Sequence, residues 1–390
     1  MPTENLREIA IRAIEDNKER LFRLSQSISD EPELLFQEHK TAAKLIAEVK
    51  DLKGIRIEKG VGGLETAFTA RLGEGHPSIA ILAEFDALPK IGHGCGHNLI
   101  STSTVGAMIG LAAAKEKLKG SVQIVGTPAE EGGGGKIILQ ERGVFNEIDV
   151  VYAIHPASTW EVGQRTLGMK QIRFKFIGKA AHAAYSPHVG RSALEAVIQT
   201  FVSINGMRQF TREDTRIHGI IEDGGTLPNI VPETGACLFF VRALEEEYVD
   251  ELMKRIENCA RAAALATDTN IEVFSGIGET YRPTKPNQAL SRVLQNILGS
   301  LGVKEIENAP YLAASNDIGT LSHHVPVSRV MIKICESEIP IHSKEFNAAS
   351  LAIRGRDGLI LAAKLQALTA IELLENPNLV EEIKAEFKKK

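Results

Sequence analysis

One short stretch of the sequence, HGCGHN, carries two side chains that bind divalent metals, Cys95 and His97. Residues two positions apart on an extended backbone point to the same side of it, and thiolate and imidazole are ligands that suit zinc and related ions. Glycines on both sides of Cys95 allow the backbone to bend close to an ion. We therefore interpret Cys95 and His97 as candidate metal ligands, although taken alone they also fit a buried free cysteine beside a turn.

A second stretch, PAEEGGGGK, places two carboxylates side by side, Glu130 and Glu131. Neighbouring side chains of an extended backbone point to opposite sides, so one carboxylate can bind a metal while the other accepts a proton as a general base. The alternative is a solvated acidic turn at the start of a helix, where the helix dipole favours negative charge. The glycine run does not fit a phosphate-binding loop, because that motif needs glycine in place of Glu130 and serine or threonine in place of Ile137.

Two further histidines follow short apolar stretches. His155 comes directly after residues 150–154, and His342 lies in the segment IPIHS, after the apolar residues 328–334. Together with the thiolate, imidazole and carboxylate of the first two stretches, they complete a mixed set of sulfur, nitrogen and oxygen ligands. A set of this size is large enough for two ions.

The elements that would position these residues alternate between strands and helices. Near-continuous apolar runs at residues 78–85, 121–127 and 150–154 predict buried strands. An alanine-rich run at residues 103–118 predicts a helix between the first two strands, and the apolar spacing over residues 6–28 predicts one long first helix. This alternation is typical of an α/β sheet with helices on both faces, in which ligands bind beyond the carboxyl ends of the strands. The candidate residues follow three of these ends.

The pattern changes after about residue 170. Alternating polar and apolar strands and two helices follow each other in the order β-α-β-β-α-β over residues 171–279. This order is the one of a small ferredoxin-like domain. We therefore expect residues 171–279 to be inserted into a larger α/β domain made of residues 1–170 and 280–390.

The motifs resemble those of the metal-dependent amidohydrolases and dipeptidases related to aminoacylase and glutamate carboxypeptidase. The segments that carry the resemblance run from residue 84 to residue 343 in the order of the family, and they are EFDALP, GHGCGHN, GTPAEEGGGGK, AIHP, GKAAHAA, TLPNIVPE and IPIHS. Within this family the sequence is most similar to the aminobenzoyl-glutamate hydrolase and β-alanyl-lysine dipeptidase group. The resemblance implies a two-domain α/β metallopeptidase, in which a catalytic domain with a mixed sheet flanked by helices carries an inserted lid.

The resemblance also implies a role for each candidate residue. The ligands of two divalent ions, whether zinc, manganese or cobalt, would be Cys95, His97, Glu131, His155 and His342. Glu130 would be the general base, which takes a proton from a metal-bridging water and passes it to the leaving amine. Asp86 would orient His97 from behind the metal site. Glu84 stands where other branches of the family have a histidine ligand, so Cys95 is the expected substitute.

Residues of the inserted domain also have implied roles. By the resemblance, this domain makes the contact of a homodimer, and its His182 reaches a neighbouring active site to stabilise the oxyanion. Asn229, in TLPNIVPE, would meet the substrate. Arg242 is a candidate for binding the substrate carboxylate, because arginine binds planar anions through two hydrogen bonds. A surface cation or an ion pair within the sheet is the alternative for Arg242.

The composition restricts the partners and the location of the protein. The 390 residues include 45 lysines and arginines against 50 acidic residues, a net charge of −5, so nucleic acid is not an expected partner. Neither a signal-peptide pattern nor an apolar run long enough to cross a membrane occurs, so a membrane partner is not expected either. The four cysteines lie far apart and give no disulfide framework. We therefore expect a cytoplasmic protein.

Three functional hypotheses follow. The first is metal-dependent hydrolysis of an amide bond in a dipeptide or an N-acyl amino acid with a free carboxylate, with an aminobenzoyl-glutamate hydrolase or a deacylase as its nearest variant. The second is a non-catalytic metal-binding scaffold of the same fold, which would not need a base such as Glu130. The third is a thiol enzyme with Cys95 as nucleophile and His97 or His93 as base, which leaves both glutamates without a role.

Overall fold

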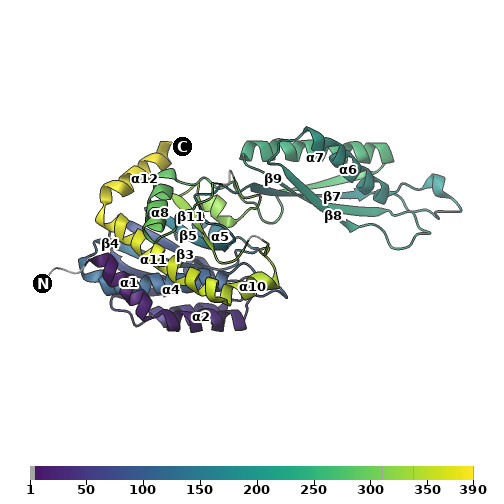
Figure 1. Ribbon diagram of the computed structural model, residues 1–390. Coiled ribbons are helices and arrows are strands. Elements are labelled where there is room, and N and C mark those ends of the chain that lie inside the picture. Colours follow the sequence, from purple (N-terminus) through teal and green to yellow (C-terminus); the bar gives the residue numbers. More distant parts are fainter. Residues whose placement is uncertain (1–4, 309–310, 337, 390) are drawn as a thin grey trace. The chain divides into compact units, whose positions relative to one another are not determined.

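The computed structural model describes residues 5–308, 311–336 and 338–389, which fall into two units (Figure 1). Unit 1 contains the chain up to Gln164 and the stretches that begin at Lys285 and Asn316, whereas unit 2 contains Arg165–Thr284 and Tyr311–Ser315. Residues 171–279, the expected insertion, lie within unit 2. The short segment Tyr311–Ser315 joins that unit from a distant part of the chain, and no sequence pattern assigned it there.

A mixed sheet forms the centre of unit 1. Its strands, in spatial order, are β1 (Ile55–Lys59), β2 (Phe68–Glu74), β4 (Gly120–Thr127), β3 (Ser78–Glu84), β5 (Val150–Ala157), β11 (Val327–Lys333) and β6 (Glu161–Val162). The four central strands β4, β3, β5 and β11 are parallel, and the remaining pairs are antiparallel. The carboxyl ends of these four strands therefore meet at one edge of the sheet.

Helices cover both faces of this sheet, as the sequence predicts. Alternate residues of β3 face opposite sides: Ile79 and Ile81 join one apolar core, and Ala80 and Leu82 join another. The first core contains α1 (Leu6–Asp16), α2 (Lys18–Asp30), α3 (His39–Val49), α4 (His97–Ala114), α8 (Gln288–Ser300), α10 (Lys344–Leu351), α11 (Ile353–Glu375) and α12 (Pro377–Lys389). The second core contains α5 (Gly135–Glu141) and α9 (Asp317–Leu321). Figure 1 shows α1, α2, α4 and α11 together on one side of the sheet.

Unit 2 has the predicted order β-α-β-β-α-β. Its antiparallel sheet runs β10 (Asn270–Ser275), β7 (Gly168–Ile177), β9 (Thr234–Ala243), β8 (Arg216–Asp223). The helices α6 (Ala193–Met207) and α7 (Glu246–Thr267) lie on one face of this sheet (Figure 1). Phe174, Phe239 and Ile256 belong to the apolar core between them. Short 3₁₀ turns complete the two units at Val61–Gly63, Lys115–Lys117, Pro187–Val189 and Arg208–Phe210.

Some predicted boundaries are wrong. The single helix expected over residues 6–28 is two helices, because Asn17 leaves the helical conformation and its side-chain amide donates to the carbonyl of Ala13 at 2.9 Å. The helix expected at residues 103–118 begins earlier, at His97, directly after Gly96 in the left-handed conformation. β1 and α12 were not predicted. Among the described residues, no helix has both the length and the apolar character needed to span a membrane.

Gly126 near the end of β4 is a position where the packing excludes a side chain. A Cβ atom built there would lie 2.3 Å from the ring of the buried Phe68. We expect Gly126→Ala to lower the free energy of unfolding by about 1–3 kcal/mol, because the ring has to move within a packed core. Chemical denaturation measures this change. Gly299→Ala is the control, because Gly299 lies in α8 with no atom within 4 Å of an added Cβ, and it should be neutral or stabilising. Equal unfolding free energies for the two variants would contradict the packing argument.

Candidate metal centre

Cys95 and His97 converge with His155 at the carboxyl edge of the sheet in unit 1. Cys95 Sγ lies 3.3 Å from His155 Nε2, and ligand atoms of all three residues lie within 4.8 Å of one another. The backbone is not extended here as the sequence argument assumed: Cys95 lies in a turn and His97 is the first residue of α4. Gly96 makes this possible, because it has a φ of 78° and an added Cβ would lie 2.7 Å from the ring of Pro156.

Asp86 connects the two parts of the site that follow β3 and β4. His97 Nδ1 lies 2.8 Å from the carbonyl oxygen and 3.0 Å from a carboxylate oxygen of Asp86, so this nitrogen is a donor. The other carboxylate oxygen of Asp86 accepts the backbone N–H of Glu131 at 2.9 Å. With its proton on Nδ1, a neutral His97 ring directs the lone pair of Nε2 into the site.

Glu130 and Glu131 lie in a turn between β4 and α5, and the predicted extended backbone is wrong here. Ala129, just before them, has a φ of 57°, which turns the chain sharply. Both carboxylates nevertheless reach the same imidazole: His97 Nε2 is 3.6 Å from Glu130 and 3.9 Å from Glu131. Glu131 also contacts His342, with 3.2 Å between a carboxylate oxygen and Nε2.

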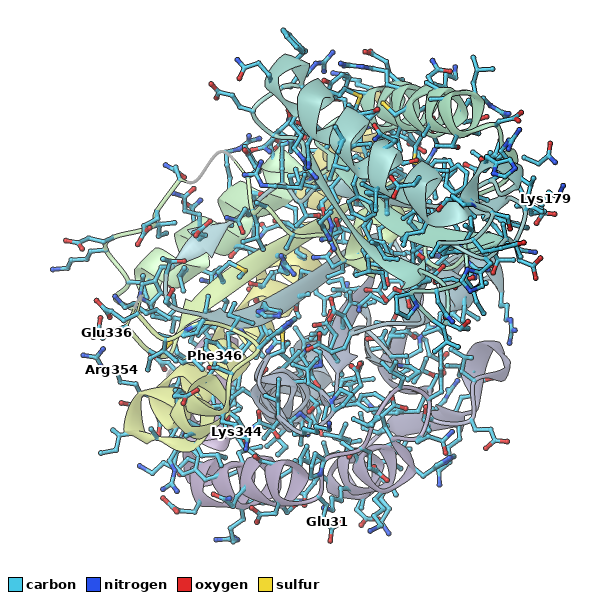
Figure 2. The ribbon with its side chains drawn as sticks, turned by 90° about the vertical axis from the view of Figure 1, so that its right-hand side faces the viewer. Glu31, Lys179, Glu336, Lys344, Phe346 and Arg354 are labelled. Atoms are coloured by element: carbon cyan, nitrogen blue, oxygen red, sulfur yellow. The ribbon has the colours of Figure 1, made fainter. Side chains whose placement is uncertain are left out.

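His155 and His342 reach the site from distant parts of the chain. His155 lies within β5, which runs to Ala157, and not after the strand as the sequence argument placed it. His342 has a φ of 67° and its backbone N–H donates to the carbonyl of Gly94 at 2.9 Å. The helix α10 follows this loop, and Figure 2 labels Lys344 and Phe346 at its start. Phe346 is fully buried, which anchors this end of the helix.

The donor set fits divalent metal ions. Three groups of candidate ligands share members at the centre of the site, and within each group the ligand atoms lie within 4.8 Å of one another. The groups are Cys95, His97 and His155; Cys95, Glu131 and His342; and His97, Glu130 and Glu131. His97 Nε2 and Glu131 Oε1 are buried without a hydrogen-bond partner among the described residues. Buried polar atoms are normally bonded, so unpaired lone pairs that face each other are suited to a shared cation. The five ligands named from the sequence are thus brought together, which makes this a candidate centre for two ions.

Burial and neighbouring charge determine the protonation of the two glutamates. Burial raises the pKa of Glu130 well above its usual range, and the nearby Glu84 adds to this effect. Burial acts in the same direction on Glu131, but its contact with His342, the largest opposing cause, lowers the pKa of Glu131 to about 2. A carboxylate that stays ionised is suited to bind a cation, and one with a raised pKa accepts a proton more readily than an ordinary glutamate.

The electrostatics do not favour a thiol nucleophile. Burial raises the pKa of the Cys95 thiol and Glu131 adds to the effect, whereas reactive thiols have a lowered pKa. His93 is 1% exposed, and burial lowers its pKa to about 3. A divalent cation would supply the positive charge that a thiolate requires at this position.

A buried ion cluster beside Glu130 was not predicted. Lys136, at 0% exposure, has its Nζ 2.7 Å from a carboxylate oxygen of Asp317 and 2.9 Å from one of Glu84. Glu84, Glu130 and Asp317 have carboxylate oxygens within 4.8 Å of one another, so Lys136 offsets their charge. Glu84 therefore contacts the lysine and belongs to the carboxylate cluster around it. The lysine directly after the glycine run was the available sequence signal, and only the fold shows that it is buried.

In unit 2, His182 and Asn229 lie on neighbouring segments. The backbone N–H of Ala183 donates to the carbonyl of Asn229 at 2.9 Å. His182 Nδ1 accepts from the backbone amides of Ala184 and Tyr185, at 3.3 and 3.1 Å. A neutral His182 ring therefore carries its proton on Nε2, which leaves an N–H donor on an exposed side chain.

Arg242 lies on β9 of unit 2 and is partly buried. Its Nη1 donates to Ser315 Oγ at 3.3 Å, and burial lowers the pKa of its guanidinium. Its Nε is buried without a hydrogen-bond partner among the described residues. A free donor on a partly buried arginine is compatible with an anionic ligand. Of the two alternatives for Arg242, a surface cation and an ion pair within the sheet, the ion pair is not observed within the described ranges.

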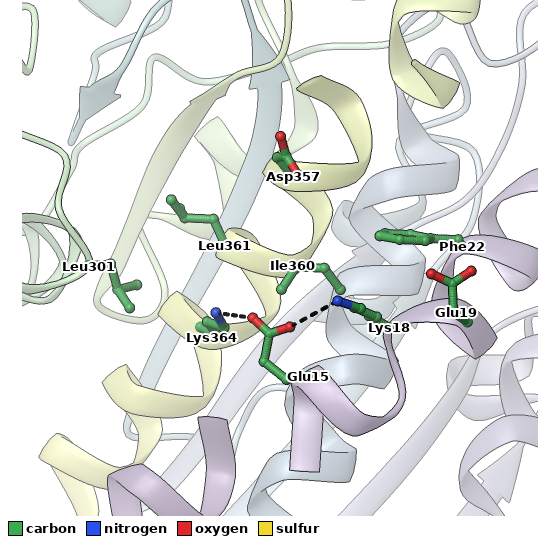
Figure 3. A pocket seen from close by; sticks show the side chains of 9 residues that line it. All are labelled: Glu15, Lys18, Glu19, Phe22, Leu301, Asp357, Ile360, Leu361 and Lys364. Atoms are coloured by element: carbon green, nitrogen blue, oxygen red, sulfur yellow. Dashed lines mark hydrogen bonds and ion pairs between the residues drawn. The ribbon is translucent and has the colours of Figure 1, made fainter. Parts of the chain in front are cut away.

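A pocket of about 460 Å³ elsewhere in unit 1 is not part of this site (Figure 3). It is lined by residues of α1, α2 and α11 and by Leu301. Three of its charged groups pair with one another, since Glu15 lies 2.6 Å from Lys364 and 4.0 Å from Lys18. None of the candidate ligands lines this pocket.

Removal of the buried cation should destabilise unit 1. We expect Lys136→Met to lower the free energy of unfolding of the metal-free protein by about 3–5 kcal/mol, because Glu84 and Asp317 then remain buried without a counter-charge. Urea denaturation measures the change, and Glu84→Gln added to Lys136→Met should recover part of it. The control is Lys53→Met, whose ion pair with Glu116 is exposed and worth less than about 1 kcal/mol. An effect of Lys136→Met as small as that of the control would contradict this account.

Comparisons with known proteins identify the family. The model of peptidase family M20/M25/M40 matches residues 80–355. The Xaa-Arg dipeptidase of Mus musculus is 34% identical, with 99% of this chain and 93% of the relative covered. A p-aminobenzoyl-glutamate hydrolase chain of Escherichia coli (strain K12) is 31% identical, with 96% of this chain and 93% of the relative covered.

Solved structures share the fold. One from Bacillus subtilis, described as a dinuclear metal binding peptidase of the M20 family, has a TM-score of 0.74 at 21% identity and covers 93% of this chain and 99% of its own. An aminobenzoyl-glutamate utilization protein from Klebsiella pneumoniae has a TM-score of 0.69 at 18% identity, with 93% and 97% covered. The chain therefore belongs to peptidase family M20/M25/M40 and is a metal-dependent amide hydrolase.

Proposed function

We propose that the site in unit 1 is the catalytic centre and that Glu130 is its general base. Cys95, His97, Glu131, His155 and His342 would hold two divalent ions. Bound ions of this kind activate water and stabilise negative charge on an amide oxygen. Glu130 accepts the proton of the attacking water and delivers it to the leaving amine. The observation that carries the proposal is the convergence of five ligand side chains beside a buried carboxylate that lies 3.6 Å from His97 Nε2.

Asp86 and the residues of unit 2 complete the proposal. Asp86 keeps the His97 ring in one orientation through its contacts with Nδ1. His182 would donate a hydrogen bond from its Nε2–H group to the oxyanion, and Asn229 would contact the substrate. The guanidinium of Arg242, with its unpaired Nε, would bind the carboxylate of the substrate.

We propose a small amide with a free carboxylate as the substrate. Dipeptides with a basic C-terminal residue come first, because the Mus musculus and Homo sapiens relatives named Xaa-Arg dipeptidase match nearly the full length of this chain. Aminobenzoyl-glutamate is the second candidate, because of the relative named for that substrate.

We also place the protein in the cytoplasm, a proposal supported by four free cysteine thiols.

We further propose a homodimer that forms through unit 2. The face of its sheet opposite α6 and α7 carries His218, Ile220, Leu238 and Phe240, and Ile220 is 60% exposed. Burial of such an apolar row in a second copy would remove it from water.

The catalytic proposal predicts metal-dependent turnover that needs Glu130. Metal-stripped enzyme should be inactive and should recover with Mn²⁺, Zn²⁺ or Co²⁺, on at least one substrate among an Xaa-Arg dipeptide, β-alanyl-lysine, aminobenzoyl-glutamate and N-acetyl amino acids. Glu130→Gln should lower kcat by about 10²–10⁴-fold, because it cannot accept the proton, while metal binding persists. The exposed Glu58→Gln is the matched control and should keep full activity. Wild-type turnover in Glu130→Gln, or activity that survives full metal removal, would refute the proposal.

The dimer proposal predicts that Ile220→Glu shifts the protein toward the monomer in sedimentation velocity, because a charge in an apolar contact is costly. Leu265→Glu is the matched control, since Leu265 is 86% exposed on α7, away from the proposed contact. The same sedimentation coefficient for wild type and Ile220→Glu, at concentrations where the wild type is dimeric, would contradict the proposed surface.

A further inference from the structure

The turn that carries Glu130 is held by a segment from the N-terminal part of unit 1. Residues 33–38 belong to the connection between α2 and α3, about a hundred positions before the turn, and contact it through Glu38. The link is direct: the backbone N–H of Ala129, the residue before Glu130, donates to Glu38 Oε1 at 3.0 Å. Residues 33–38 lie outside the part of the chain that the family model matches, which begins at residue 80.

Glu38 is a fully buried carboxylate whose two oxygens accept three hydrogen bonds. Its Oε1 accepts from the backbone amides of Phe36 and Ala129, each at 3.0 Å, and its Oε2 accepts from Thr66 Oγ1 at 2.9 Å. A buried carboxyl group costs free energy unless its oxygens are bonded. These three donors therefore fix the carboxyl group, and the carboxyl group in turn fixes the amides.

The two amides bound by Oε1 belong to residues in an unfavourable conformation. Phe36 has a φ of 59° and Ala129 has a φ of 57°, both in the left-handed region that non-glycine residues avoid. Each costs about 1–2 kcal/mol, so each persists only where surrounding contacts enforce it. Glu38 Oε1 accepts a hydrogen bond from both residues and so helps to hold both in this conformation.

The other end of the same turn is packed against Phe36. A Cβ atom added to Gly133 would lie 2.5 Å from the Phe36 ring, so the ring lies directly on the glycine backbone. The turn is thus held at Ala129 by a hydrogen bond and at Gly133 by an aromatic ring. Glu130 and Glu131 lie between these two contacts.

We infer that Glu38 is a positioning residue for Glu130, which sets the place of the base by fixing the turn through the amide of Ala129. The inference rests on the proposed role of Glu130. The effect should fall on proton transfer and therefore on kcat, because a base that is displaced by even 1 Å reacts about a hundredfold more slowly while substrate binding is unchanged. Metal binding should persist, since the contacts of Cys95, His97 and His155 do not involve Glu38, and the backbone N–H of Glu131 is held separately by Asp86 at 2.9 Å.

The test compares Glu38→Ala and Glu38→Gln. We expect Glu38→Ala to lower kcat about 10–100-fold with KM within about twofold of wild type. Glu38→Gln keeps an oxygen that can accept from the amides, so it should restore kcat to within about fivefold of wild type. The Co²⁺-loaded variants should keep the wild-type absorption spectrum, including the thiolate band of a Cys95–cobalt contact.

The matched control is Thr41→Val. Thr41 is fully buried in the first turn of α3, and its hydroxyl donates to Glu33 at 2.9 Å without touching the turn at Glu130. Thr41→Val should lower the free energy of unfolding by about 1 kcal/mol and leave kcat unchanged.

If Glu38→Ala does not fold, Thr66→Val removes one of the donors to Glu38 and should lower kcat several-fold. Values of kcat in Glu38→Ala or Thr66→Val equal to that of Thr41→Val, or a loss of cobalt affinity that parallels the loss of kcat, would overturn the inference.

The failure of this inference differs from the failure of the proposed function. If Glu130→Gln is inactive and Glu38→Ala has wild-type kcat, Glu130 remains the base and only the role of Glu38 is wrong. If Glu130→Gln keeps wild-type kcat, the role of the base is wrong, and the positioning role of Glu38 is wrong with it.

Discussion

The burial of many ionisable groups at one edge of a parallel sheet is the constraint on which the rest of the structure depends. Four parallel strands end together, and the segments around their ends carry a thiol, three imidazoles and several carboxylates. Each charge removed from water requires a partner. Lys136 supplies one for Glu84 and Asp317, and Asp86 accepts from both His97 and the backbone of Glu131. What these contacts leave is a group of unpaired lone pairs directed at one another, which is the condition for binding cations.

The backbone of the site is shaped by left-handed residues at the places where the chain has to turn. Gly96 brings Cys95 and His97 onto one side, Ala129 turns Glu130 and Glu131 toward His97, and His342 itself has a positive φ. Only the first of these is a glycine, so the others need contacts that hold them. Glu38 provides such a contact for Ala129 and Gly94 provides one for His342. Rigidity at these turns is what a catalytic site needs, because proton transfer depends steeply on distance.

Much of the fold, and the convergence of the candidate ligands at one edge of the sheet, could be predicted from the sequence, because apolar runs and strand ends are local signals. The apolar runs predict β3 and β4 almost to the residue, and candidate ligands follow both strands. Errors arose where a single side chain decides a conformation, as Asn17 does between α1 and α2, or where a positive φ replaces an extended backbone, as at Ala129. Lys136 and Glu38 were missed because their importance lies in burial and in partners distant along the chain, and neither is encoded in local spacing.

The central claim is that five side chains from separate segments hold two metal ions beside Glu130. Anomalous diffraction from crystals of the manganese-loaded protein, recorded on both sides of the metal absorption edge, tests it most directly. The account predicts two anomalous peaks in unit 1, with Cys95 and Glu131 near both and His97, His155 and His342 completing the ligands. A single peak at the carboxylates of Glu84 and Asp317, or two peaks away from Cys95, would contradict it.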